Sequence, residues 1–93
     1  MRILLLGANG QLGSDIARLW AGQPGIDLLT ATRADADVTD LAAVRALVER
    51  TRPGLVINTT AFHNLPLCEQ DPVTAMTVNV AGGWNVATAA REA

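Results

Sequence analysis

The sequence predicts an α/β protein, a three-layer Rossmann-type βαβαβα half-domain whose parallel sheet has the spatial strand order 3-2-1. Three observations support this fold class. Apolar runs typical of strands alternate three times with helical patterns, a glycine-rich turn follows the first run, and 49% of the 93 residues are hydrophobic. Strands that alternate with helices form parallel sheets through right-handed crossovers. We therefore expect one compact domain with helices packed on the sheet.

The first unit begins with an apolar strand at residues 3–6, followed by the glycine-rich turn and a helix. A second turn at residues 22–25 ends this helix, and we expect the second strand near residues 27–32. Apolar residues at helical spacing predict the inner face of the helix: Leu12, Ile16, Leu19 and Trp20.

The second helix is expected to begin after Thr39, a plausible N-cap, and to end before Pro53. A buried-looking strand follows at residues 55–57. The helix is predicted to turn Leu41, Val44, Leu47 and Val48 inward and Arg45, Glu49 and Arg50 outward.

The third helix is expected to start at Asp71-Pro72, because aspartate caps free amides and proline has none to lose at the first helical position. Its predicted inner stripe is Val73, Met76, Val80, Trp84 and Ala87. Trp20 and Trp84 are interpreted as core or interface anchors.

The predicted strand order leaves the strand at residues 3–6 as an uncovered, apolar sheet edge. Such an edge presents unpaired backbone groups, so we expect association through it, either as a homo-oligomer, with another polypeptide, or with further residues of a longer protein. The chain closes at Glu92-Ala93 without a helix stop signal. We therefore expect residues 1–93 to be a truncated half-domain without the catalytic and substrate-binding part.

Composition excludes several function classes. Seven arginines against nine acidic residues give a net charge of −2, and the arginines are scattered, which argues against nucleic-acid binding. No apolar run approaches a membrane span or a signal peptide, so we expect a cytoplasmic protein without membrane contact. One cysteine and one histidine allow neither an internal disulfide nor a recognisable zinc site, so no metal is expected.

Gly7, Gly10 and Gly13 carry the strongest functional signal. Glycines at this spacing between a strand and a helix allow a sharp turn, close approach of a ligand to the backbone, and tight packing of helix on sheet. The amides of Gln11 and Leu12 at the helix start would then face the phosphates of a dinucleotide. The alternative is a flavodoxin-like or receiver-like domain in which this turn is a plain connector.

The end of the second strand bears on the choice between NAD and NADP. It lacks the carboxylate that accepts from the ribose 2′-hydroxyl in NAD sites and has Arg33 instead. A guanidinium suits a 2′-phosphate, so NADP(H) is favoured over NAD(H). Two alternatives remain: Asp35 could contact the ribose if the strand runs further, or Arg33 is a solvated surface charge.

Three segments in order carry a family resemblance: Gly7 to Gly13, Asp37-Val38-Thr39-Asp40, and the run from Val56 to Phe62. With them the chain resembles the extended short-chain dehydrogenase/reductase superfamily, and within it the dTDP-4-dehydrorhamnose reductase family. The resemblance implies that cofactor-binding residues lie in three groups, with Gly10, Gln11 and Leu12 at the pyrophosphate, Asp37 and Val38 beside the adenine, and Ala61, Phe62 and His63 along the ribose and nicotinamide. Alternatively, Asp37 and Asp40 cap the second helix.

The sequence departs from that family in its catalytic chemistry. Relatives use a tyrosine proton donor with a lysine four positions later, and this chain contains neither residue type. Arginine does not replace them, because it does not release its proton. Pro66-Leu67 also stands where the family commonly has an acidic and a polar residue. We assign no catalytic residue, interpret His63 as a positioning residue, and interpret Cys68 as a small buried apolar residue.

Two functions follow. The first is the cofactor-binding N-terminal portion of an NADP-dependent 4-keto nucleotide-sugar reductase, not catalytically competent alone, whose nucleotide-sugar substrate binds only in a longer parent chain. The second is a stand-alone dinucleotide-binding or assembly module without catalysis. The same half of a nucleotide-sugar epimerase or dehydratase is a further alternative.

Overall fold

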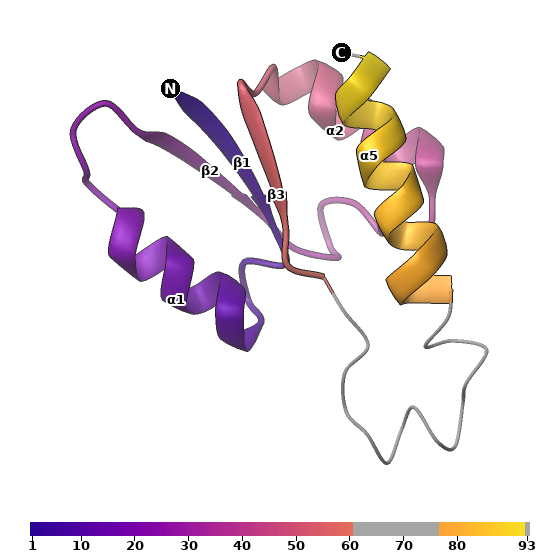
Figure 1. Cartoon of the computed structure of the whole chain (residues 1–93), viewed down its shortest axis with the longest axis horizontal. Coiled ribbons are helices and arrows are strands. Elements are labelled where there is room, and N and C mark those ends of the chain that lie inside the picture. The colour runs from indigo at the N-terminus through magenta and orange to yellow at the C-terminus, as the bar shows by residue number, and fades with distance from the viewer. Residues whose placement is uncertain (61–76, 93) are drawn as a thin grey trace.

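The computed structural model describes residues 1–60 and 77–92 and confirms the predicted alternation of strands and helices there (Figure 1). The elements in chain order are β1 (Arg2–Leu6), α1 (Gln11–Trp20), β2 (Asp27–Ala31), α2 (Leu41–Thr51), β3 (Leu55–Asn58), the π-helical turn η1 (Thr77–Gly82) and α5 (Gly83–Glu92). The predicted helix start at Asp71-Pro72, with Val73 and Met76, lies outside the described residues.

The three strands form a parallel sheet in the order β2-β1-β3. Ile3 pairs with Leu28 of β2 on one side and with Leu55 of β3 on the other. The parallel sheet is therefore confirmed, but the predicted order 3-2-1 is wrong. The chain passes from β1 to β2 in one direction, and α2 then carries it back past β1 to β3.

The central position of β1 follows from its composition. Its residues from Ile3 to Leu6 are at most 3% exposed, whereas Leu55 at the start of β3 is 43% exposed. A strand that is apolar on both faces belongs in the middle of a covered parallel sheet, whereas β2 contains Asp27 and Thr30 and β3 ends in Asn58. The prediction that β1 is a free edge seeking a partner is therefore wrong.

Helices lie on both faces of the sheet, which confirms the three layers (Figure 1). Helix α1 lies on one face, and α2 packs beside α5 on the other. The main core lies under α2 and α5. It comprises Leu4, Leu6, Ala31, Ala36, Val38, Val44, Leu47, Val48, Val86 and Ala89.

Helix α2 buries the face that its sequence predicts. Val44, Leu47 and Val48 are at most 4% exposed. Its N-cap is Asp40, whose Oδ1 accepts from the amide of Ala43 at 3.2 Å, and not the predicted Thr39. Asp40 is one residue nearer to the first turn, so its carboxylate reaches the amide at the third helical position, where cap side chains usually bind.

Helix α1 does not bury the predicted apolar stripe. Leu12 is 61% exposed and Leu19 is 70% exposed, whereas Gly13 is buried. The reason is that α1 contacts the strand layer through Gly13, its smallest residue. This contact turns the two leucines away from the sheet. Ile16 and Trp20 are half-buried at the margin of that contact.

Helix α5 also presents a different face from the predicted one. Trp84 is 71% exposed and Ala87 is also exposed, and Val80 in the preceding turn η1 is 65% exposed. The buried residues of α5 are instead Val86 and Ala89. Small and β-branched residues on the buried face let α5 approach α2 closely. The two helices are further joined by Arg45, whose Nε and Nη2 donate to the carboxylate of Glu92 at 2.8 Å each.

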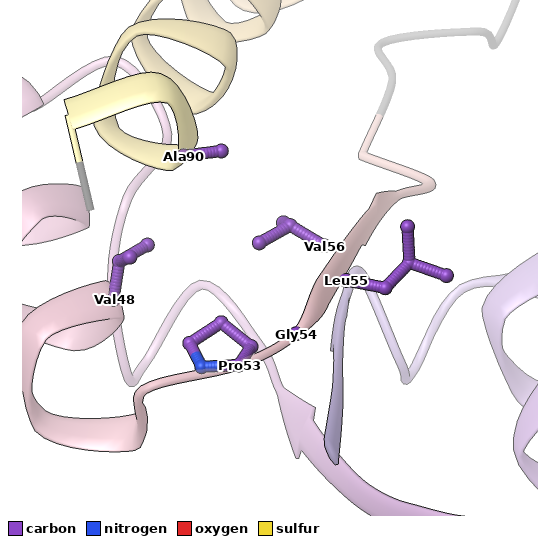
Figure 2. A pocket seen from close by; sticks show the side chains of 6 residues that line it. All are labelled: Val48, Pro53, Gly54, Leu55, Val56 and Ala90. Atoms are coloured by element: carbon purple, nitrogen blue, oxygen red, sulfur yellow. The ribbon is translucent and has the colours of Figure 1, made fainter. Parts of the chain in front are cut away.

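An apolar hollow lies at the amino end of β3, between α2 and α5. Figure 2 shows its lining residues, which are Val48, Pro53, Gly54, Leu55, Val56 and Ala90. Ligands of parallel α/β sheets bind at the opposite, carboxyl ends of the strands.

No helix among the described residues is long and apolar enough to cross a membrane.

Candidate functional site at the carboxyl ends of the strands

The observed strand order creates a switch point between β1 and β3. The connections from β1 to β2 and from β2 to β3 run in opposite directions, and α1 and α5, the described helices that follow β1 and β3 in the chain, lie on opposite faces of the sheet. In open α/β sheets, ligands bind in the crevice outside the carboxyl ends of the strands at such a point. The glycine turn after β1 therefore lies where a ligand site is expected.

Gly7 makes the turn off β1 in direct contact with the end of β3. Its φ of 79° lies in the left-handed region, which favours glycine. A Cβ here would lie 2.6 Å from Oγ1 of Thr59 and 3.0 Å from the amide nitrogen of Thr60. The hydroxyl of Thr59 donates to the carbonyl oxygen of Leu6 at 2.7 Å, which holds the two strand ends together.

Gly13 lets α1 pack directly on this turn. A Cβ at position 13 would lie 2.1 Å from the carbonyl oxygen of Gly7 and 2.9 Å from Oγ1 of Thr59. Neither neighbour has room to yield, because one is backbone and the other is hydrogen-bonded to backbone. Gly13 therefore sets the position of the helix start relative to the sheet.

Gly10 has a third role, because without a side chain it leaves the first turn of α1 uncovered. It is the exposed N-cap of α1 with ordinary φ of −79°, and its missing Cβ would contact only the carbonyl oxygen of Gly7, at 3.3 Å. No side chain caps α1, and its first turn contains no acidic residue. The amides of Gln11 and Leu12 at this exposed end have no acceptor within the helix.

Three other amides of the turn are already hydrogen-bonded within the protein. Gly7 and Ala8 both donate to the carbonyl oxygen of Ala31, at 3.0 and 3.2 Å, and Gly10 donates to Gly7 at 3.0 Å. The turn is thus tied to the end of β2, while the positive end of α1 faces outward. Such an end suits an anion, and phosphate groups are its commonest ligands.

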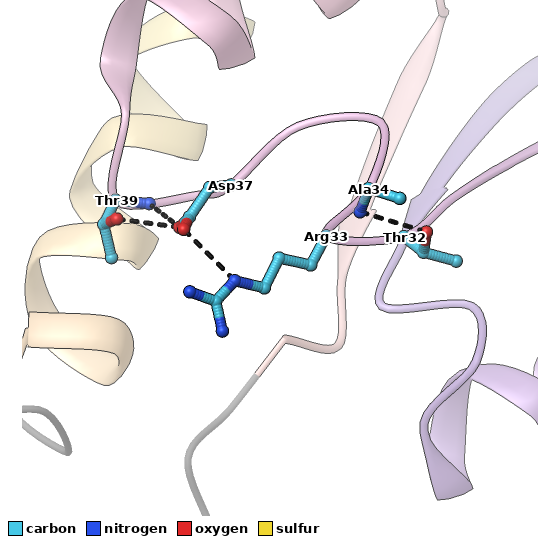
Figure 3. Close-up of polar contacts among 5 residues, drawn as sticks. All are labelled: Thr32, Arg33, Ala34, Asp37 and Thr39. Carbon is cyan, nitrogen blue, oxygen red and sulfur yellow. Dashed lines mark hydrogen bonds and ion pairs between the residues drawn. The ribbon is translucent and has the colours of Figure 1, made fainter.

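The segment after β2 brings Arg33 and Asp37 together (Figure 3). Nε of Arg33 lies 3.3 Å from Oδ2 of Asp37, and the Arg33 side chain is 88% exposed. Figure 3 shows Nε joined to Asp37 by a dashed line and neither terminal guanidinium nitrogen joined to it. The terminal nitrogens are therefore free to face an anion while Nε stays on the carboxylate.

The electrostatics of Asp37 are set chiefly by Thr39. Oδ1 of Asp37 accepts from the amide of Thr39 at 3.0 Å and from its hydroxyl at 2.7 Å. These hydrogen bonds hold the pKa of Asp37 below its ordinary value of 3.8, and the Arg33 guanidinium lowers the pKa further, against a partial opposing effect of burial. Asp37 is thus a turn-forming carboxylate, whereas the cap of α2 is Asp40 alone.

Asp35 closes the turn at the end of β2. Its Oδ2 accepts from the amide of Thr32 at 2.8 Å. The strand ends at Ala31, so the longer strand that would bring Asp35 to a ribose is not formed. The side chain of Val38 is 5% exposed and belongs to the core cluster, so only its backbone reaches this surface.

The structure adds one residue that no sequence motif indicated. Nδ2 of Asn85 on α5 donates to the carbonyl oxygen of Val38 at 2.9 Å. The sequence signal that could have identified Asn85 is a polar residue on the half-buried side of a predicted helix.

Ala61, Phe62, His63 and Cys68 lie outside the described residues. Within the described part of the chain, no group of three or more metal-binding side chains occurs.

Comparison with known proteins agrees with this geometry. The family model described as RmlD substrate binding domain matches residues 1–93. The dTDP-4-dehydrorhamnose reductase of Streptomyces griseus is 37% identical over 90 residues, which are 97% of this chain and 29% of that protein.

Two solved structures resemble the chain closely. The dTDP-4-dehydrorhamnose reductase of Clostridium acetobutylicum is 34% identical with a TM-score of 0.91, over 99% of this chain and 32% of that one. The Bacillus anthracis enzyme, solved in complex with NADP, is 28% identical with a TM-score of 0.87, over 98% and 32%. The chain therefore spans about a third of the length of these relatives.

Proposed function

This chain belongs to the RmlD substrate binding domain family, as its motifs predicted, and on that premise we propose that it binds the dinucleotide cofactor of a 4-keto nucleotide-sugar reductase. Residues 1–93 form the NAD(P)-binding half-domain in this proposal. The Streptomyces griseus relative is named dTDP-4-dehydrorhamnose reductase, and the Bacillus anthracis relative was solved with NADP. The sugar substrate would be bound by a longer parent chain.

The observation that carries the proposal is that the three glycines have three different structural roles in the turn. Gly7 turns the chain against β3, Gly13 brings α1 close, and Gly10 leaves the helix start accessible. This is the set of tasks that glycines perform in dinucleotide-binding turns. A plain strand-to-helix connector needs none of the three, so the flavodoxin-like or receiver-like alternative does not account for them.

The proposed cofactor site has three parts along the strand ends. The backbone from Gly10 to Leu12 would hold the pyrophosphate, and the Asp37-Val38 segment would lie beside the adenine. Ala61, Phe62 and His63 are predicted to line the nicotinamide side. A bound nicotinamide cofactor supplies the hydride for ketone reduction, and these residues bind and orient it.

A preference for NADP(H) is proposed on the basis of Arg33. Its Nε contacts Asp37 while the side chain as a whole stays 88% exposed, and Asp35 accepts from Thr32. A guanidinium forms paired, charge-assisted hydrogen bonds with phosphate. Ordering of Arg33 by Asp37 reduces the conformational entropy that such a contact would cost.

No catalytic residue is assigned within the chain. Hydride transfer to a ketone also needs a proton for the developing alkoxide, and the chain contains neither tyrosine nor lysine. We therefore propose that the 93 residues bind cofactor without reducing a ketone by themselves.

Direct binding of NADPH to the 93-residue chain tests the proposal. Calorimetry should give one site per chain, and NADPH at a hundred times its dissociation constant should stabilise the fold by roughly 2.7 kcal/mol. Gly10→Leu places a side chain over the exposed helix start without entering the core, so it should weaken NADPH at least about tenfold.

Gly54→Ala is the matched control, because a Cβ there meets only ordinary contacts at the amino end of the sheet. It should leave NADPH affinity within about twofold. A wild-type chain that melts at the same temperature with and without saturating NADPH would overturn the proposed function.

A further inference from the structure

The segment between β2 and α2 has no regular secondary structure, yet it alternates between core and surface. Ala36 is 6% exposed and Val38 is 5% exposed, whereas Asp37 between them is half-buried and holds Arg33. The two buried side chains anchor the segment in the core and direct Asp37 outward. The position of Asp37 therefore depends on how the backbone at Val38 is held.

Most hydrogen bonds of this segment are local. Asp35 and Ala36 donate to the carbonyl oxygen of Thr32, and Asp40 donates to that of Asp37. Local bonds of this kind shape a turn but do not fix it relative to the rest of the molecule. Within the part of the chain that the structure describes, the bond from Asn85 to Val38 is the one hydrogen bond that joins residues 33–39 to a distant element.

We propose that Asn85 is a positioning residue for the adenosine end of the proposed cofactor site, an inference that rests on the proposed function. Its Nδ2 reaches the Val38 carbonyl oxygen from α5, 47 residues further along the chain. Val38 directly follows Asp37, so this bond holds the backbone that carries the Asp37 carboxylate and, through it, the Arg33 guanidinium. Asn85 acts through these groups and does not itself touch the cofactor.

The chemistry of the side chain fits this task. A carboxamide donates a strong hydrogen bond without adding charge, so it fixes the backbone without changing the potential around Arg33 and Asp37. Without it, the Val38 carbonyl would remain in a partly buried place with no partner, and the segment would move to reach water. The expected consequence is loss of order at the adenosine end, while the helix start at Gly10 is unchanged.

Binding of two probes separates this role from general stability. The first probe is 2′,5′-ADP, which carries the adenosine and the 2′-phosphate. The second is inorganic pyrophosphate, which reports on the helix start alone. Both are titrated into the 93-residue chain and followed by amide chemical shifts. Asn85→Leu, which keeps the volume but loses the donor, should weaken 2′,5′-ADP about five- to tenfold and leave pyrophosphate within twofold.

Further variants keep the test decisive. Asn85→Ala should behave as Asn85→Leu does, in case the leucine disturbs packing, and Asn85→Gln should recover most of the affinity because it keeps the donor. Arg45→Ala is the matched control, since it breaks the α2–α5 ion pair without touching the Val38 carbonyl. Arg45→Ala should leave both probes unaffected.

The outcomes are distinct. Equal loss of 2′,5′-ADP in Asn85→Leu and Arg45→Ala, or unchanged affinity in both Asn85→Leu and Asn85→Ala, overturns the positioning role. A wild-type chain that binds pyrophosphate but not 2′,5′-ADP also overturns it, while leaving the phosphate site intact. A wild-type chain that binds neither probe refutes the proposed function itself.

Discussion

The carbonyl oxygen of Gly7 lies where a side chain on Gly13 would begin, because a Cβ at position 13 would come within 2.1 Å of it. This contact fixes the start of α1 against the end of β1. It also explains why the helix exposes Leu12 and Leu19, since the smallest residue on α1 is the one that meets the sheet layer. The site and the packing of the first helix thus depend on the same pair of residues.

Gly13→Ala should destabilise the fold by about 1–3 kcal/mol, because α1 must shift to admit one methyl group. Urea unfolding measures this. Gly83→Ala is the control, since a Cβ there meets nothing within 4 Å inside α5. That change should stabilise the chain by roughly 0.5–1 kcal/mol. Two variants of equal stability would contradict the close contact.

Arg33→Ala should weaken NADPH by about tenfold or more and NADH by less than about twofold, because only NADPH offers a 2′-phosphate to the guanidinium. Calorimetry with both cofactors measures the ratio. Arg18→Ala removes another highly exposed arginine, which pairs with Asp15 on α1, and it should change neither affinity. Equal losses of NADPH and NADH in Arg33→Ala would refute the NADP preference.

Asp37 should contribute to stability in a pH-dependent way. Hydrogen bonds from Thr39 lower its folded-state pKa below 3.8, so the charged form is the one that the fold favours. The stabilisation is fully present above the unfolded pKa near 3.8 and is lost as the pH falls through the lower folded-state value. NMR titration of the Asp37 side-chain carbonyl should therefore give a midpoint below 3.8.

Asp37→Asn should flatten the corresponding part of the stability profile, measured by urea unfolding between about pH 2 and pH 6. The loss of stability on acidification should be smaller in this variant than in the wild-type chain. A titration midpoint of Asp37 at or above 3.8, or identical acid profiles for the two chains, would contradict the role assigned to Thr39.

Asp40→Ala should cost about 1 kcal/mol, because the amide of Ala43 loses its capping acceptor. For a domain of this size, such a loss lowers the melting temperature by roughly 4–8 °C. Asp40→Asn keeps a capping oxygen and should retain most of the stability. If Asp40→Ala melted at the wild-type temperature, the assignment of this N-cap would be wrong.

Local patterns in the sequence predicted the elements well. The period of Val44, Leu47 and Val48 identified the inner face of α2, and the glycine spacing placed the turn after β1. Such features depend on neighbours within one or two turns of the chain. The buried faces of α1 and α5 were predicted less well. Apolar residues at helical spacing do not show which side of a helix is buried when small residues make the contact.

By itself, the sequence determined the alternation of strands and helices, the glycine turn and the family, since each is encoded in a short stretch of residues. Only the tertiary structure decided that β1 lies between β2 and β3, and that Asn85 reaches Val38 across 47 positions. The physical reason is that strand order and long-range hydrogen bonds depend on how separate elements share one core. The switch point that defines the candidate site arises from that arrangement.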